Sequence, residues 1–175
     1  MKRLTSSVGL TIGIFALVGL GTFRGAESAG GDEAKPFRAG AHAMDITPTW
    51  FPIVVNGMFQ PRYADEAHDP LHARCLVLDD GGQQVALVEV DSCVIGRELM
   101  DEAKRLAHEA TGIPTDRMFL AATHTHSAPS VAGALNTDPD EKYVQFLPGR
   151  IAEGVRRAQE NLAPAKVGWG VGELP

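Results

Sequence analysis

The sequence predicts an α/β fold: a mixed β-sheet with packed helices, in the order β-loop-β-β-α-β-α-β. Short apolar runs bounded by turn residues are typical of strands, and two longer segments carry apolar residues at helical spacing. A single hairpin signal adds an antiparallel pair to strands that otherwise alternate with helices. The 175 residues, 44% hydrophobic and 22% charged, suit one globular domain.

The N-terminus has the layout of a secretory signal. Lys2 and Arg3 precede the uncharged run Val8–Leu20, and small residues follow it. We therefore expect a signal peptide over 1–29, a linker over 30–37 and one domain over 38–175, in a protein exported to the periplasm or the exterior. An uncleaved N-terminal segment that anchors the chain is the alternative, although the run is shorter than the about 20 residues of a transmembrane helix.

The domain begins with a predicted strand over Arg38–Ile46. The segment Thr49–Pro70 that follows has no sustained periodicity and is broken by Gly and Pro. Long irregular loops are uncommon unless they are functional or disordered, and this one is too apolar for disorder. We expect an ordered loop that offers apolar groups to a ligand: Trp50, Phe51, Met58, Phe59 and Tyr63.

A hairpin is predicted over Leu71–Leu78 and Gln84–Asp91, with its turn at Gly81-Gly82. Its strands are apolar on both faces, which predicts a central position in a sheet that is covered on both sides. In this register Cys93 would lie on the order of 17 Å from Cys75. A disulfide needs Cα atoms within about 7 Å, so both cysteines are expected to be free thiols packed as small apolar residues.

Helices and strands alternate in the second half of the chain. A helix is predicted over Gly96–Thr111, ended by a glycine, and an apolar strand over Met118–Thr123. A second helix is predicted over Asp140–Leu162, kinked or split by the Pro148 inside it. A last strand is expected over Lys166–Gly172, and the sheet is expected to be incomplete at its C-terminus.

The charge of the chain excludes some classes of partner. A net charge of -6 and a pI near 5.5 argue against nucleic acid, because nucleic-acid binding usually needs a basic surface. They also predict no attraction to anionic lipid head groups. A lipid substrate would therefore have to be held by apolar contacts.

The strongest functional signal is the segment Thr123–Pro129, which reads Thr-His-Thr-His-Ser-Ala-Pro and begins where an apolar strand ends. The carboxyl ends of strands in α/β sheets are common ligand sites. Alternate residues of an extended segment point the same way, so His124 and His126 should project to one side about 7 Å apart. Both could face one metal ion, or one could bind it while the other contacts substrate. A pair of surface histidines is the alternative, since two histidines cannot complete a tetrahedral zinc site.

The segment Ala121–Pro129 also resembles the zinc-binding stretch of neutral/alkaline non-lysosomal ceramidases, commonly written A-T-H-T-H-S-G-P. Asp45–Pro48 is similar to the opening D-I-T-P of that family, and His68–Arg74 is similar to its H-D-P-L-x-A-R strand. The resemblance covers residues 38–175, as the N-terminal part of the family's catalytic domain. Ala128 and Ser130 depart from the family pattern, because they stand where it has glycine.

This resemblance implies a zinc-dependent amide hydrolase that cleaves N-acyl sphingoid lipids, such as ceramide, to a fatty acid and a sphingoid base. It makes His124 a zinc ligand, His126 a catalytic group against the substrate amide, and Gly57 part of the substrate site. In the family, the other zinc ligands and a catalytic serine lie beyond the equivalent of Pro175. The chain is therefore expected to be a fragment that is inactive when made alone. It would meet a membrane surface only through its lipid substrate, and its oligomeric state is not predicted.

Two weaker site candidates are Asp91 and His68. Asp91 ends a predicted strand and could orient a ligand histidine, or serve as a turn residue bonded to backbone. His68 could donate a hydrogen bond to a residue that binds the zinc ion, or it could cap the N-terminus of a strand. Two other functions remain open. One is a metal hydrolase of the same fold that acts on another amide or ester, and the other is a non-catalytic exported domain whose histidines are a remnant.

Overall fold

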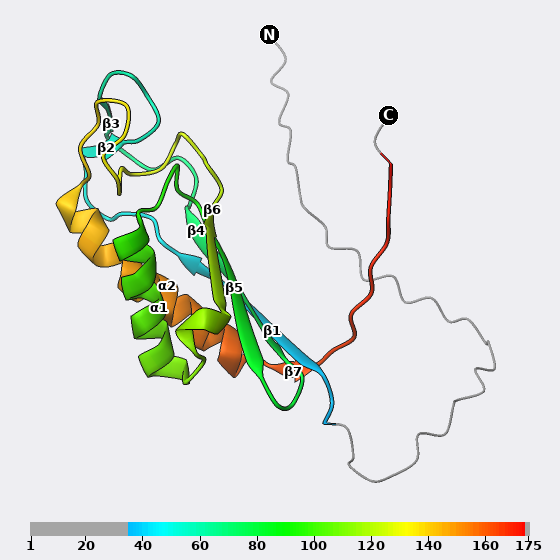
Figure 1. The fold of residues 1–175 in the computed structure, drawn as a ribbon. Coiled ribbons are helices and arrows are strands. Elements are labelled where there is room, and N and C mark those ends of the chain that lie inside the picture. The colour runs from blue at the N-terminus through cyan, green and yellow to red at the C-terminus, as the bar shows by residue number, and fades with distance from the viewer. Residues whose placement is uncertain (1–34, 174–175) are drawn as a thin grey trace, which may run out of the picture. The chain divides into compact units, whose positions relative to one another are not determined.

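Residues 35–173 are described by the computed structural model of the chain, so the predicted signal peptide and residues 30–34 of the predicted linker lie outside the described part. They form a five-stranded sheet with strand order β6-β5-β4-β1-β7, two α-helices and a separate two-stranded sheet (Figure 1). The predicted α/β class, a mixed sheet with packed helices, is confirmed. In chain order the elements are β1 (Arg38–Asp45), β2 (Ile53–Val55), β3 (Arg62–Ala64), β4 (His72–Asp79), β5 (Gln84–Val90), α1 (Arg97–Thr111), a 3-10 turn (Thr115–Arg117), β6 (Met118–Ala122), α2 (Glu141–Glu160) and β7 (Ala163–Pro164).

Strand pairing places the ends of β5 and β6 side by side. β4 pairs antiparallel with β1 and with β5, and Cys75 stands opposite Val88 in the predicted hairpin register. β5 and β6 run parallel, with Val90 opposite Ala122. A parallel pair needs a long crossover connection, which the 15-residue helix α1 and the 3-10 turn supply. The carboxyl ends of β5 and β6 therefore meet at one edge of the sheet.

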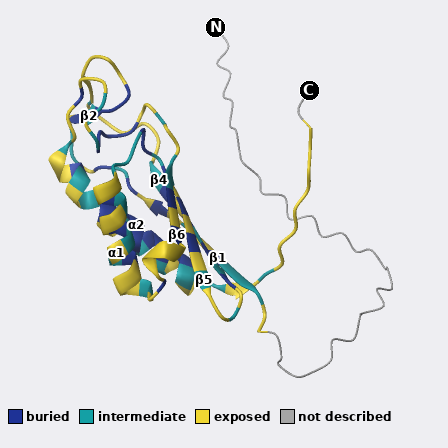
Figure 2. Ribbon diagram, in the orientation of Figure 1, coloured by how far each residue is buried: buried dark blue, intermediate teal, exposed yellow. Residues whose placement is uncertain are grey.

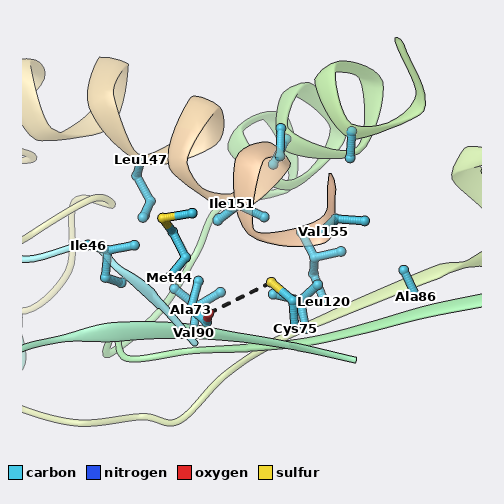
Figure 3. Close-up of a cluster of buried hydrophobic side chains, with 14 of the residues drawn as sticks. Met44, Ile46, Ala73, Cys75, Ala86, Val90, Leu120, Leu147, Ile151 and Val155 are labelled. Carbon is cyan, nitrogen blue, oxygen red and sulfur yellow. Dashed lines mark hydrogen bonds between the residues drawn. The ribbon is translucent and has the colours of Figure 1, made fainter. Parts of the chain in front are cut away.

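Both helices lie on one face of the sheet (Figure 1). Along β4 and β5, buried residues alternate with more exposed ones (Figure 2). Figure 3 shows the core between α2 and the strands, where Met44, Leu147 and Ile151 meet. Neither helix in the described part of the chain is long and apolar enough to cross a membrane.

The face of the sheet opposite the helices differs from the prediction of a sheet covered on both sides. Within residues 35–173 it is left uncovered, and Leu87 and Phe119 on neighbouring strands are 41% and 65% exposed. The prediction of a sheet covered on both sides is therefore wrong for this part of the chain. The reason is that α1 and α2 pack against each other on the same side.

Two segments differ from their predicted structure. The segment 49–70 is not irregular throughout, because β2 and β3 pair within it. The predicted strand Lys166–Gly172 is wrong: only Ala163–Pro164 pairs with β1, and residues 166–173 are exposed and form no strand. A strand needs a neighbour, and β1 begins at Arg38, opposite Pro164, so it offers none to the residues that follow.

Helix α2 is continuous through Pro148, so the predicted split does not occur. Proline removes only one backbone N–H from the helix. Leu147 and Ile151, on either side of it, are fully buried and hold the helix against the sheet. Its N-terminus is capped by Asp140, whose carboxylate accepts a hydrogen bond from the backbone N–H of Tyr143 at 2.8 Å.

Cys75 and Cys93 are free thiols and both are buried, as predicted. Their surroundings differ. Cys75 is part of the hydrophobic core, its sulfur lies 3.7 Å from the carbonyl oxygen of Ala73 (Figure 3), and burial raises the pKa of its thiol to about 12. A thiol in that position stays protonated and unreactive. Cys93 lies outside the core cluster, at the end of the sheet where β5 and β6 finish.

We predict that Gly154→Ala lowers the free energy of unfolding by about 1–3 kcal/mol, the usual cost of overpacking. Gly154 lets α2 lie close to the sheet, because a Cβ there would be 2.7 Å from Cys75 Sγ and 3.0 Å from Met44 Cβ. Gly149→Ala on the same helix is the matched control, since a Cβ at that position meets nothing within 4 Å. It should instead raise stability by about 0.5–1 kcal/mol. Urea unfolding measures both variants, and equal effects would contradict this packing.

Candidate metal centre

The candidate site is built where the parallel strands β5 and β6 end. Cys93 is the third residue after β5, and His124 is the second residue after β6. The pairing extends one residue further, since Thr123 donates its backbone N–H to the carbonyl oxygen of Val90 at 2.9 Å. Residues that leave the sheet from such adjacent carboxyl ends are brought together, and ligands commonly bind there.

His124 is held by a hydrogen bond to the backbone at the end of β5. Its Nδ1–H donates to the carbonyl oxygen of Cys93 at 2.7 Å. A carbonyl can only accept, so this bond places the imidazole proton on Nδ1 and leaves the lone pair of Nε2 for a metal ion. His124 also has a φ of 62°, a left-handed conformation that is uncommon for a residue other than glycine and occurs often at functional sites.

His126 lies beside His124 at the edge of the sheet where β5 and β6 end, which we call the rim. The two ring centroids are 5.1 Å apart, and the rings are inclined at 75°. This agrees with the predicted projection of both side chains to one side of the segment. The backbone carbonyl oxygen of His126 accepts a hydrogen bond from the Arg62 guanidinium at 2.7 Å, which ties the segment to β3.

The small sheet of β2 and β3 packs its backbone against the histidine segment. Asn56 donates its N–H to the carbonyl oxygen of Ala128 at 3.1 Å, and Ser130 donates to Val54 at 2.9 Å. The Asn56 side chain is buried, donates to the carbonyl oxygen of Ala132 at 3.0 Å and accepts from the N–H of Gly57 at 2.6 Å. These bonds fix the turn that carries Gly57 against the site.

Gly57 lies under the ring of His126. A Cβ at this position would be 2.6 Å from His126 Cγ, and the φ of Gly57 is 92°. Only glycine combines that backbone conformation with so close an approach. The residue that the sequence resemblance assigned to the substrate site is therefore in direct contact with the residue that it assigned to catalysis.

Cys93, His124 and His126 form the potential metal-binding group of this rim. One ligand atom from each lies within 4.8 Å of the others, with Cys93 buried and both histidines exposed. Imidazole nitrogen and thiol sulfur are donor types that zinc prefers, so these residues fit the metal that the fold family implies. Sequence reasoning missed Cys93 because it treated the thiol as core packing. Its position just past β5, matching that of His124 past β6, was the signal that could have found it.

Asp91 stabilises the end of the β4–β5 hairpin. Its carboxylate accepts hydrogen bonds from the Arg74 guanidinium at 2.7 Å and from the backbone N–H of His72 at 2.9 Å. No hydrogen bond in residues 35–173 joins it to His124 or His126. The role of orienting His124, considered for Asp91 from the sequence, is filled by the carbonyl oxygen of Cys93.

His68 is 94% exposed and pairs with Asp69 at 3.1 Å. That hydrogen bond raises the pKa of His68. The structure places it with Asp91 on a hollow of about 530 Å³, whose wall also includes Thr125 and Ser127. The two histidines of the metal centre do not line this hollow.

The apolar residues predicted to face a ligand separate into two groups. Trp50 and Phe51 are partly buried against the core, and Trp50 packs on the ring of Phe146 at 5.5 Å. Met58, Phe59 and Tyr63, in and around the turn between β2 and β3, are exposed. Core packing therefore accounts for Trp50, whereas Phe51 also lines the hollow of about 530 Å³. The exposed second group is free to contact a ligand.

No family model and no curated protein matches the chain. Two solved structures are similar to it. A neutral ceramidase from Pseudomonas aeruginosa is 24% identical, with a TM-score of 0.64 over 76% of this chain and 23% of its own. A ceramidase complexed with C2 is 26% identical, with a TM-score of 0.62 over 74% of this chain and 22% of its own. The chain has a neutral ceramidase-like fold, as the sequence resemblance implied, and spans less than a quarter of the length of either ceramidase.

We predict that Gly57→Ala displaces the His126 ring, because the new methyl group would overlap it. The matched control is Gly112→Ala: Gly112 also has a positive φ, of 75°, but a Cβ there meets nothing within 4 Å. Both variants should lose about 1 kcal/mol of stability from the left-handed backbone. Only Gly57→Ala should shift the imidazole NMR signals of His126, and unchanged signals in that variant would contradict the contact.

Proposed function

We propose that this chain carries the metal-binding rim of a zinc-dependent amide hydrolase that cleaves N-acyl sphingoid lipids. The observation that carries the proposal is the pair of histidines at the carboxyl end of β6, with His124 Nδ1 bonded to the Cys93 carbonyl oxygen, in a ceramidase-like fold. The same residues on a loop without a shared orientation would support only a pair of surface histidines.

His124 would hold the zinc ion through Nε2, the nitrogen that its hydrogen bond leaves free. When bound, zinc supplies a water of lowered pKa and polarises the acyl carbonyl of the substrate. The hydrogen bond to Cys93 keeps the ring of His124 in the tautomer and orientation that binding needs. The backbone carbonyl of Cys93 therefore orients the exposed imidazole of His124.

His126 would contact the substrate amide. Its ring is exposed on the same rim, is supported from below by Gly57, and belongs to a segment tied down by Arg62. A ring so placed can donate a hydrogen bond to the oxygen that gains charge, or a proton to the leaving nitrogen. The tight contact with Gly57 limits the ways in which the ring can turn, which favours a single working orientation.

The acyl chain would be held by apolar contacts beside the rim. Met58 and Phe59 follow directly after Gly57, and Phe59 is 81% exposed. The net charge of -6 offers no attraction to anionic head groups, so contact with a membrane would be made through the lipid itself. Export remains part of the proposal, supported by Lys2, Arg3 and the apolar run Val8–Leu20.

We predict that His124→Ala removes zinc from the protein expressed from its native gene. His108→Ala is the matched control, because His108 is an exposed residue of α1 whose Nδ1 contacts the carbonyl oxygen of Ile113 at 2.9 Å, away from the metal centre. Elemental analysis after dialysis should find zinc in the control and little in the His124 variant. Full zinc in His124→Ala would overturn the ligand assignment.

The activity test uses a short-chain fluorescent ceramide and, as the comparison substrate, the matching fatty-acyl ester. The protein from the native gene should hydrolyse the amide, lose this activity with a chelator and regain it with zinc. The 175-residue chain alone is expected to be inactive. Zinc-loaded native protein that cleaves only the ester would favour the other metal hydrolase. No hydrolysis of either substrate would favour a non-catalytic domain.

A further inference from the structure

The sulfur of Cys93 is buried apart from the main hydrophobic cluster. Cys93 is only 4% exposed, yet it is outside the hydrophobic core cluster to which Cys75 belongs. Its Sγ lies 4.0 Å from Nδ1 of His124 instead. A buried sulfur beside an exposed imidazole, at the edge of the sheet where ligands bind, is placed to take part in chemistry as well as in packing.

A hydrogen bond from the thiol to His124 does not provide that explanation. Nδ1 of His124 carries its proton and donates it to the carbonyl oxygen of Cys93 at 2.7 Å. A protonated Nδ1 has no lone pair for the thiol proton of the same residue. The sulfur therefore stands close to the imidazole without using Nδ1 as an acceptor.

The spacing of the donor atoms suits a shared metal ion. One ligand atom each from Cys93, His124 and His126 lies within 4.8 Å of the others. In a tetrahedral zinc site the Zn–S distance is about 2.3 Å and the Zn–N distance about 2.0–2.1 Å, so a sulfur and a nitrogen ligand are about 3.5 Å apart. The sulfur and a ring nitrogen of this group, at most 4.8 Å apart, need to approach by no more than about 1.3 Å, which small side-chain rotations can supply.

We propose that Sγ of Cys93 binds the same metal ion as His124. This inference rests on the proposed metal site and adds a ligand that the sequence resemblance did not assign. On binding, the thiol releases its proton to solvent and the sulfur enters as a thiolate. His126, next to both ligands, keeps its place toward the substrate. The two ligands come from adjacent strand ends, β5 and β6, so the ion would join two parts of the chain that are separated by the whole of α1.

Cobalt(II) tests the inference, because a cobalt–thiolate bond has an intense charge-transfer absorption in the near ultraviolet that nitrogen and oxygen ligands lack. The reduced, metal-free protein expressed from its native gene is titrated with cobalt(II) and its spectrum is recorded. We expect the thiolate band in the wild-type chain and in Cys75→Ala, whose sulfur is in the core. Cys93→Ser should lose the band and bind cobalt at least about tenfold more weakly, since even residues behind the ligands change affinity by 10–100-fold.

Further variants separate the possible outcomes. His126→Ala should keep the band, and His124→Ala should abolish it together with tight binding. Cobalt that binds through His124 with no thiolate band in the wild-type chain would overturn the role of Cys93 and leave the proposed metal site standing. Native-gene protein that binds no cobalt would overturn both. Far-ultraviolet circular dichroism of each variant checks its fold, and the wild-type band is a readout that depends on no substitution.

Discussion

The parallel pairing of β5 with β6 positions every part of the candidate centre. With Val90 opposite Ala122, the chain leaves both strands at the same edge, and Cys93 and His124 come together although 31 residues separate them. The 2.7 Å bond between the Cys93 carbonyl oxygen and His124 Nδ1 then determines which nitrogen of the imidazole is free. A slip of one residue in this register would turn the alternating side chains to the opposite face and separate the two groups.

The rim also keeps two backbone positions in the left-handed region, His124 with a φ of 62° and Gly57 with a φ of 92°. For a residue such as His124 this conformation costs on the order of 1–3 kcal/mol. Backbone hydrogen bonds between the β2–β3 sheet and the histidine segment offset that cost, as does the buried Asn56 that holds the turn before Gly57. The fold therefore maintains a conformation that the histidine segment alone would not favour, and it presents both imidazoles on one rim.

Much of this arrangement could be predicted from local pattern. The hairpin register followed from its glycine turn, and the end of α1 from its terminal glycine. The rings of His124 and His126 lie together as predicted, but His124 has left the strand and is in a left-handed conformation, so strand periodicity is not the reason. The rest depended on contacts between distant segments. Apolar residues on both faces of the hairpin did not reveal that α1 and α2 share one side, and the predicted strand Lys166–Gly172 has no neighbour because β1 begins opposite Pro164. Cys93 was missed because its role depends on the end of another strand.

Anomalous X-ray scattering at the zinc absorption edge, from crystals of the zinc-loaded protein expressed from its native gene, tests the central claim most directly. The account predicts one anomalous peak at the carboxyl ends of β5 and β6, about 2.0–2.1 Å from Nε2 of His124 and about 2.3 Å from Sγ of Cys93. A peak near Nε2 of His124 but out of bonding distance of Sγ of Cys93 would show that only histidine binds the metal. A zinc ion bound elsewhere, or no peak at this rim at saturating zinc, would contradict the account.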